Sequence, residues 1–342
     1  MHKFLPFILL CFGLVCQDAI AQTTSCAQTL RLARSTYEQG RLHELPDLLK
    51  GCLNNGFTQQ EKVEAYKFLT LSYIYLEEPE KADEAMLKLL QTDHYFKINP
   101  AVDPAEFVAL YKTFRTQPIY RFGGNLGMLA AQPNVTSSTE AIDGTSEYKR
   151  GYSFLIGLNG EIPLNEKWTL NPGIYYLSNS FSLTSSVTTS TGDFITTANQ
   201  KMNYISIPVT IQYQVMKNKL NPYVTMGVST DYLLSATVQA ERKRPGFQPI
   251  ETTTFTVTPQ REKLNFSGVA GIGIKTSIAG GFAIAEVRYR YGFTNVNSKS
   301  STFDNSDLVF NYHYVDSIFK LQATSFTLGY VYNIFNPKKR NR

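Results

Sequence analysis

The sequence predicts an all-β antiparallel transmembrane barrel of eight strands that follows an all-α N-terminal domain. In residues 202–215 and 221–234, apolar and polar side chains alternate with a period of two, over strands about twice as long as those of ordinary globular sheets. One face is apolar and the other polar and small, which is typical of strands that cross a bilayer. Beyond the N-terminus there is no run of 18 apolar residues, so no transmembrane helix is predicted.

Residues 1–21 have the features of a secretory signal peptide. Lys3 is the basic start, Phe4 to Val15 the apolar core, and Ala19-Ile20-Ala21 the small-residue cleavage site. A lipoprotein site at Cys16 is the alternative, although valine precedes that cysteine where a small residue is expected. We therefore predict that the chain is exported.

Cys26 and Cys52 are the cysteines that remain after such cleavage. They could form a disulfide between two neighbouring antiparallel helices, which would contribute roughly 3 kcal/mol, or they could be two buried free thiols. We expect the disulfide. The sequence has no cysteine and histidine spacing of the kind that binds a metal, and we predict no cofactor.

Apolar residues recur at helical spacing from Cys26 to about Thr116. Thr58 followed by Glu61 predicts a capping box at one helix start, and Asp103-Pro104 followed by Glu106 predicts another. Residues 22–117 are therefore expected to form a helical domain.

Part of this domain, residues 65–90, resembles a tetratricopeptide repeat. The residues that fall where the repeat packs its two helices are Tyr66, Leu69, Tyr73, Ala82, Met86 and Leu89. The resemblance implies a surface that binds a partner protein, and the residues it places on the inner face are Glu64, Lys67, Leu71, Ile74 and Tyr75. The alternative is that these five residues pack on the preceding helix pair.

From residue 118 to residue 335 the periodicity is that of strands. The predicted strands are Ile119–Ala131, Tyr152–Leu164, Trp168–Leu183, Met202–Val215, Asn221–Ala240, Lys263–Ser277, Phe282–Val296 and Ser317–Phe335. Three connections are short (165–167, 216–220, 278–281), and four are long and polar (132–151, 184–201, 241–262, 297–316). Outer-membrane barrels have short turns in the periplasm and long loops outside, so we expect the helical domain in the periplasm.

Seven charged residues fall on inward positions of these strands. They are Arg121, Glu161, Asp231, Lys275, Glu286, Arg288 and Arg290. Eight strands enclose a space that side chains fill, so the sequence predicts a salt-bridged plug. The alternative is a narrow ion path gated by Arg288 and Arg290. The alternation reverses at residues 177–183 and 319–323, which predicts bulges or strand extensions above the membrane.

Four segments together resemble the PorT-like outer-membrane β-barrel family: NYISIPVTIQYQV, LNPYVTMGVSTDYLL, SGVAGIGIKTSIAGGFAIAEVRYRYGFTNV and SFTLGYVYNIF. The linker DPAEFVALYKTFRTQPIYRFGG resembles the join between the helical and barrel parts of such proteins. The resemblance implies an outer-membrane location. One member of the family takes part in type IX protein secretion, and most members have no assigned activity.

Basic residues are concentrated in the loop Glu241-Arg242-Lys243-Arg244 and in the tail, residues 336–342. The loop could bind anionic lipopolysaccharide, with a solvated loop as the alternative. We predict a solvated, periplasmic tail, with contact to an acidic partner as the alternative. An exported barrel makes a nucleic-acid partner improbable, and the expected surroundings are outer-membrane lipid.

An enzymatic site would require a combination such as His313 with Asp307 or Asp316 and Ser317, which polar loops supply by chance. The sequence has no phosphate-binding loop and no GxSxG motif. We therefore predict a non-enzymatic outer-membrane protein whose helical domain docks an envelope or protein-secretion component. The alternative is a small-solute channel or a surface receptor that acts through the long loops.

Overall fold

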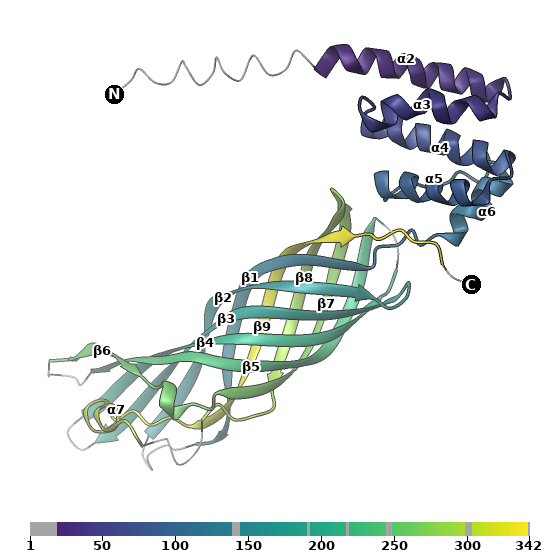
Figure 1. Cartoon of the computed structure of the whole chain (residues 1–342). Coiled ribbons are helices and arrows are strands. Elements are labelled where there is room, and N and C mark those ends of the chain that lie inside the picture. The colour runs from purple at the N-terminus through teal and green to yellow at the C-terminus, as the bar shows by residue number, and fades with distance from the viewer. Residues whose placement is uncertain are drawn as a thin grey trace, which may run out of the picture. The chain divides into compact units, whose positions relative to one another are not determined.

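A computed structural model of the chain describes residues 19–138, 144–189, 192–216, 219–243, 246, 248–297 and 303–340. The chain forms two compact units, of which one contains the residues up to Pro118 together with Phe335–Arg342, and the other contains Ile119–Ile334. Figure 1 shows helices in the first unit and strands in the second. Residues 1–18 of the predicted signal peptide and Arg244 of the predicted basic loop lie outside the described residues.

The helices of the first unit are α2 (Ala19–Glu38), η1 (Leu42–Glu44), α3 (Leu45–Asn54), α4 (Gln59–Tyr75), α5 (Pro79–Thr92) and α6 (Ala105–Thr113). Their apolar side chains form two clusters, one around Leu45 and Leu49 and the other around Met86, Leu89 and Phe107. Within the described part of the chain, no helix is both long enough and apolar enough to cross a membrane.

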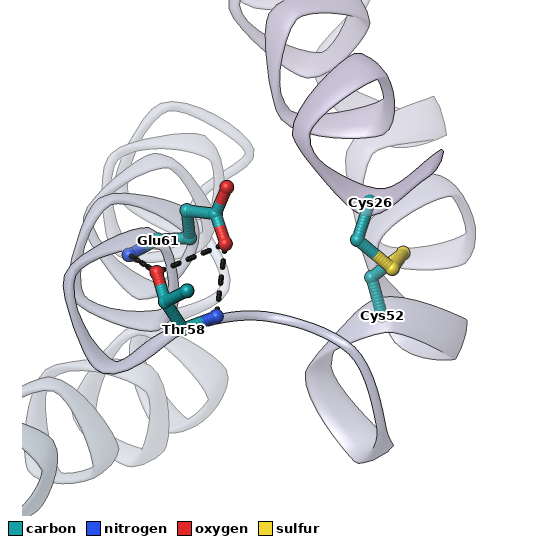
Figure 2. Close-up of a disulfide and its surroundings, with 4 residues drawn as sticks. All are labelled: Cys26, Cys52, Thr58 and Glu61. Atoms are coloured by element: carbon teal, nitrogen blue, oxygen red, sulfur yellow. Dashed lines mark hydrogen bonds between the residues drawn. A yellow bond between two sulfur atoms is a disulfide. The ribbon is translucent and has the colours of Figure 1, made fainter. Parts of the chain in front are cut away.

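Two local features organise the first half of the helical unit (Figure 2). A disulfide joins Cys26 of α2 to Cys52 of α3, so the two cysteines form the expected bridge and are not free thiols. The predicted capping box of α4 is confirmed, because Thr58 Oγ1 accepts the Glu61 N–H and the Glu61 carboxylate accepts the Thr58 N–H at 2.8 Å.

The second predicted capping box is wrong. Helix α6 begins at Ala105, and the preceding Pro104 provides no side-chain cap. The Asp103 carboxylate instead accepts hydrogen bonds from Lys67 Nζ at 2.5 Å and from the Asn99 N–H at 2.7 Å. A buried carboxylate needs a cation and donors nearby, and this requirement outweighs the helix cap.

The backbone of the C-terminal tail pairs within the helical unit, while the side chains of Lys338, Lys339 and Arg340 remain exposed, as expected of a solvated tail. The Arg115 N–H donates to the Lys338 carbonyl at 2.9 Å. Phe335, which we expected to close the last strand, lies beyond the end of that strand and stacks on His94 with ring centroids 5.0 Å apart. Further contacts join Arg340 to Thr113 and Lys339 to Asp83. Backbone pairing and aromatic stacking therefore fix the path of a tail whose charged side chains stay exposed.

The second unit is an antiparallel barrel. Its strands are β1 (Tyr120–Ser137), β2 (Gly144–Pro163), β3 (Trp168–Thr189), β4 (Gly192–Gln214), β5 (Leu220–Lys243), β6 (Ile250–Thr256), β7 (Leu264–Ile278), β8 (Gly281–Gly292) and β9 (Ile318–Ile334). Strand β1 pairs with β2 and β9, and the β4–β5 pairing closes a ring of eight strands. The predicted eight-stranded barrel is confirmed. Strand β6, which pairs with the end of β5, was not predicted.

Short turns gather at one end of the barrel, which we call the turn end, and the opposite end is the loop end. The turn between β7 and β8 consists of Ala279 and Gly280, both with positive φ, as a two-residue hairpin requires. The barrel also begins and finishes at the turn end, where Tyr120 pairs with Ile334.

At the loop end the strands are longer than predicted. Residues 132–151 and 184–201 were expected to be long polar loops, but they are mostly strand, and the β3–β4 ladder continues to the pair Thr189 and Gly192. Their threonines favour strands, but the segments lack the apolar alternation by which a strand is recognised in sequence. The other two long connections contain η2 (Thr258–Gln260) and α7 (Ser306–Tyr312).

Strand β4 shows how the barrel wall changes along its length. Toward the turn end, Ser206 and Gln212 are buried inside, while Ile207 is exposed on the outer face. Toward the loop end, the inward residues Met202 and Tyr204 belong to an apolar core, which we call the loop-end core. This core also contains Leu177, Phe181, Leu183, Phe319 and Ala323. The reversed alternation at residues 177–183 thus marks a strand extension, one of the two predicted explanations.

Candidate functional site

The seven charged residues predicted to face the lumen form three ion-paired groups inside the barrel. In the first, Glu161 lies between Arg121 Nη1 at 3.0 Å and Lys275 Nζ at 2.5 Å. Lys275 also donates to Gln212 Oε1 at 2.8 Å. The Glu161 and Lys275 side chains are only 2% and 4% exposed, so each depends on the other rather than on water for its charge.

The second and third groups each pair one carboxylate with one arginine. Arg290 Nη1 lies 2.5 and 2.6 Å from the two carboxylate oxygens of Asp231. Glu286 pairs with Arg288 and also accepts the Tyr223 hydroxyl at 2.6 Å. All three inward carboxylates are thus neutralised by bases of the same wall.

The cavities beside these groups are small. One of about 30 Å³ is lined by Asp231 and Arg290 among others, and another of about 20 Å³ is lined by Arg288 and Arg290. Each takes about one water molecule. Both arginines of the predicted ion path are therefore held by carboxylates and surrounded by side chains, an arrangement that fits a plug.

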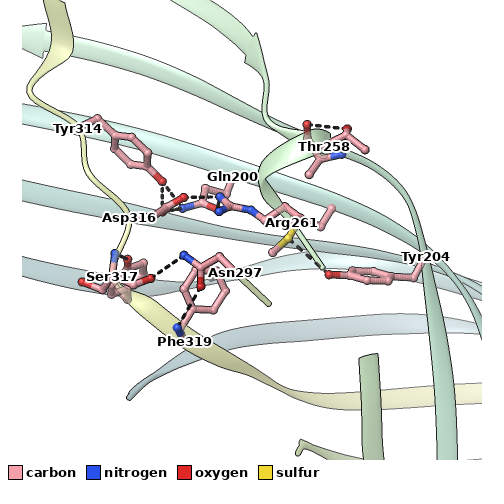
Figure 3. Close-up of polar contacts among 12 residues, drawn as sticks. Gln200, Tyr204, Thr258, Arg261, Asn297, Tyr314, Asp316, Ser317 and Phe319 are labelled. Carbon is pink, nitrogen blue, oxygen red and sulfur yellow. Dashed lines mark hydrogen bonds and ion pairs between the residues drawn. The ribbon is translucent and has the colours of Figure 1, made fainter. Parts of the chain in front are cut away.

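A fourth buried ion pair, Arg261 with Asp316, lies inside the loop end (Figure 3). Gln200 bridges the two, since its Nε2 donates to Asp316 Oδ1 at 2.8 Å and its Oε1 accepts from Arg261 at 3.1 Å. The Tyr314 hydroxyl also donates a hydrogen bond to the Asp316 carboxylate. Sequence reasoning missed this pair because both charged residues lie in connections that were expected to be solvated loops.

The residues of the Ser/His/acid alternative have separate environments. His313 stacks on Phe194 with ring centroids 6.3 Å apart, and burial followed by the charge of Arg242 lowers the pKa of His313. Asp316 is held by Arg261, and the Ser317 N–H donates to the Tyr148 hydroxyl. In the part of the chain that the structure describes, no three His, Cys, Asp or Glu side chains are grouped to hold a metal.

The predicted basic loop is partly engaged with the barrel. The Arg242 guanidinium lies over the Phe194 ring at 4.3 Å and donates to the Asn311 carbonyl at 3.0 Å. Lys243 pairs with Glu241 at 3.0 Å. Binding of lipopolysaccharide by this loop stays a prediction, with two of its bases already paired.

The predicted partner face of the helical unit is only partly open in the structure. Leu71 is buried in the cluster of Met86 and Phe107, and Ile74 packs against the same cluster. Lys67 pairs with Asp103, and Glu64 pairs with Arg34. Tyr75 remains 48% exposed. Helix α2 and the α6 region cover this side of α4, and sequence spacing does not show which side of a helix its neighbours cover.

The electrostatics of the Lys67–Asp103 pair follow from its burial. Burial alone would raise the pKa of the Asp103 carboxyl, but the hydrogen bond from Lys67 and the Asn99 N–H outweigh it and lower that pKa below its ordinary value. The pair therefore fixes the segment that leads into α6 most firmly when Asp103 is ionised.

The opposite side of α4 borders an open cleft of about 450 Å³, which we call the α3–α5 cleft. Its lining residues are Pro46, Asp47, Lys50, Leu53, Asn54, Tyr66, Leu69, Tyr73, Lys81, Glu84, Ala85 and Lys88. Leu69 and Ala85 are buried at its floor. Lys81 lies over the Tyr73 ring at 5.7 Å, and Lys88 pairs with Glu84 at 2.7 Å. From the sequence, Tyr66, Leu69 and Tyr73 were expected only to pack the helices together. The spacing of Lys81, Glu84 and Lys88 on α5 nevertheless indicates one charged helix face.

The chain is similar to known outer-membrane β-barrel proteins. The model of the outer membrane protein beta-barrel domain family matches residues 117–298, more than half of the chain. Neisserial surface protein A is a similar solved structure, with 12% identity over 62% of this chain and 97% of that one, and a TM-score of 0.31. OprG from Pseudomonas aeruginosa has 12% identity over 64% and 98% of the two chains, with a TM-score of 0.32. Ail of Yersinia pestis has 11% identity over 63% and 98%, with a TM-score of 0.27. No functionally curated protein matches the chain.

Proposed function

The chain belongs to the outer-membrane β-barrel domain family, and we propose that it is a non-enzymatic anchor whose helical unit docks another envelope protein. In this proposal the helical unit is tetratricopeptide-like and lies in the periplasm, and the barrel is PorT-like. Because one PorT-like protein takes part in protein secretion, a secretion component is a candidate partner. The observation that carries the proposal is a filled barrel combined with a separate helical unit that has an open cleft.

The filled lumen favours an anchor over a channel. A conducting barrel needs a continuous aqueous path, whereas this one places Glu161, Asp231 and Glu286 in ion pairs and leaves cavities of about 30 and 20 Å³ beside Arg290. Moving those side chains would break buried ion pairs, which costs about 3–5 kcal/mol for each carboxylate left unpaired. The filled barrel is therefore well suited to anchor the helical unit to the membrane.

The ends of the barrel support the periplasmic placement. Barrels of outer membranes have short turns on the periplasmic side. Strand β1 begins and β9 ends at the turn end, and the chain continues from both points into the helical unit. The helical unit would then lie on the side where envelope components are accessible.

The α3–α5 cleft has the chemistry of a protein-docking surface. Its floor contains Tyr66 and Leu69, and three lysines and two carboxylates surround it. Aromatic and aliphatic anchors with a charged rim are typical of peptide recognition. The disulfide between α2 and α3 and the partly buried Lys67–Asp103 pair stabilise the helices that border the cleft.

Photocrosslinking in intact cells tests the proposal. A photoreactive residue at Lys50, on the cleft rim, should capture one dominant envelope protein, and the same residue at the exposed Arg31 of α2 should not. A Lys88→Glu change in the cleft should abolish the capture. Capture of nothing from Lys50, together with ion conductance by the purified full chain in planar bilayers, would refute the docking function and favour the channel.

A further inference from the structure

Strand β6 offers an unpaired edge at the loop end of the barrel. One edge of β6 pairs with the end of β5, from Thr237 opposite Thr256 to Ala240 opposite Thr253. Figure 1 shows β6 beside β5, beyond the main barrel wall. Along the other edge of β6, no strand of the described residues is paired. Such an edge presents backbone donors and acceptors to any extended chain.

The hydrogen-bond pattern identifies which residues present these groups. The Val257 N–H donates to the Ala236 carbonyl at 2.9 Å, so Ala236 and Val257 form a hydrogen-bonded pair. Because hydrogen-bonded and non-hydrogen-bonded pairs alternate in an antiparallel ladder, Phe255 and Thr253 point their backbone groups toward β5. Thr254 and Thr256 therefore point theirs toward the unpaired edge.

The strand is held in place by contacts on its inner face. The Phe255 ring packs edge-on against Tyr312 of α7, with centroids 5.4 Å apart, and the Tyr312 hydroxyl donates to the Glu251 carbonyl at 2.9 Å. A strand that is already ordered loses little conformational entropy when it accepts a neighbour. The edge is thus formed before any partner arrives.

The sequence of β6 has few of the devices that usually protect an edge, and Glu251 is its one charged residue. Natural edge strands carry Lys, Pro or inward charges that discourage pairing. Residues 250–256, IETTTFT, contain neither Lys nor Pro, and four of the seven are threonine. Threonine favours strands and forms favourable pairs with threonine on a facing strand. The one irregularity is the register shift between Ala240 and Arg242, which leaves the pairs at Thr254 and Thr256 regular.

From this edge we infer that β6 binds an extended segment of another polypeptide, which adds to the barrel wall as a further antiparallel strand. Backbone hydrogen bonds at Thr254 and Thr256 would supply affinity, and an uncharged, β-branched segment would fit the threonine face. This function is independent of the docking proposed for the helical unit, because it uses residues of the second unit only.

Symmetry excludes a second copy of the chain in the same membrane as the partner. Two β6 edges paired antiparallel would be related by a two-fold axis perpendicular to their sheet. Because β6 continues the wall of β5, that axis is roughly perpendicular to the barrel axis, and one barrel would be inverted relative to the other. A different polypeptide has no such restriction.

The test uses the full chain in detergent and a fluorescent synthetic peptide with the sequence of residues 249–257, PIETTTFTV, which as a free strand can pair with the edge. We expect a saturable rise in fluorescence anisotropy. A peptide N-methylated at its three consecutive threonines should not bind, because it lacks donors on both edges. Absence of saturable binding by the unmodified peptide would overturn the inference.

Two variants at one position separate backbone pairing from side-chain contact. Thr254→Pro removes an outward donor, which edge strands tolerate, and should weaken the peptide about tenfold. Thr254→Val keeps the donor and should bind within about twofold of the wild type. Hydrogen exchange at Phe255 should stay protected in both variants, which shows that β6 is intact. Equal binding by the proline variant and the wild type, with Phe255 protected, would refute the assigned edge.

Discussion

The barrel is built in opposite ways in its two halves. Toward the turn end, Ile207 and Met226 point outward with 52% and 67% of their surface exposed, and Ser206 is buried inside. Toward the loop end, Phe181 and Met202 are buried inside, and the neighbouring Lys201 is exposed. The two halves share the same eight strands and the same alternation of side chains, so backbone geometry does not account for the difference.

The difference shows that the surrounding medium decides which face is apolar. Lipid accepts apolar side chains on the outer face, and the lumen then contains polar groups that must be paired with one another. Beyond the membrane the outer face meets water, and apolar residues gather inside as in any soluble protein. On β4 the change falls between Tyr204 and Ile207, which marks the boundary of the lipid-facing band on this strand.

The largest effect is expected when a buried ion pair in the lipid-facing half is broken. Glu161→Leu leaves Lys275 buried without its carboxylate and should lower the free energy of unfolding by about 3–5 kcal/mol. The double variant Glu161→Leu, Lys275→Met should recover most of this loss, since the remaining Arg121 is partly exposed. Urea unfolding in lipid vesicles measures both variants, and a double variant as unstable as the single one would contradict the assignment.

A pair of arginine substitutions on the outer face of β5 tests the boundary directly. Met226→Arg places a charge in the lipid-facing band and should cost about 2–4 kcal/mol. Gln239→Arg, on the outer face of the same strand at the loop end, should change stability by less than about 0.5 kcal/mol. The same unfolding assay in vesicles compares them. Equal costs at the two positions would show that the loop-end half is also surrounded by lipid.

Sequence alone was sufficient for the lipid-facing half and less so for the rest. The alternation in residues 202–215 predicts that strand, and the alternation in residues 263–277 predicts the inward position of Lys275, because lipid imposes a regular apolar face. The threonine-rich β6 has no such face, and its pairing depends on how far β5 extends. Its strand conformation therefore could not be predicted from its own residues.

The helical unit shows a second limit of sequence reasoning. The spacing of Thr58 and Glu61 predicts a local capping box, since both groups belong to one helical turn. Leu71 was placed on a partner face because its spacing fits one side of α4, but that side is covered by the segment around Phe107. Which side of an amphipathic helix stays open depends on contacts between residues far apart in sequence, and spacing within one helix contains no such information.

The smallest effect is expected at the partly buried ion pair of the helical unit, where water rather than lipid is the surrounding medium. Asp103→Asn removes the charge that pairs with Lys67 and should lower the stability of the α6 region by about 1–3 kcal/mol at neutral pH. Because the folded pKa of Asp103 lies below its unfolded value of about 3.9, the stabilisation is complete well above that value.

The same pair should make this region sensitive to acid. As pH falls below about 4 and through the folded pKa of Asp103, the stabilisation should be lost in the wild type. In Asp103→Asn this part of the pH dependence should be absent, so the two proteins should converge in acid. Hydrogen exchange of α4 and α6 amides in the full chain measures the effect. A difference between the two proteins that persisted unchanged below pH 3 would mean that lost packing, rather than the lost charge, destabilises the variant.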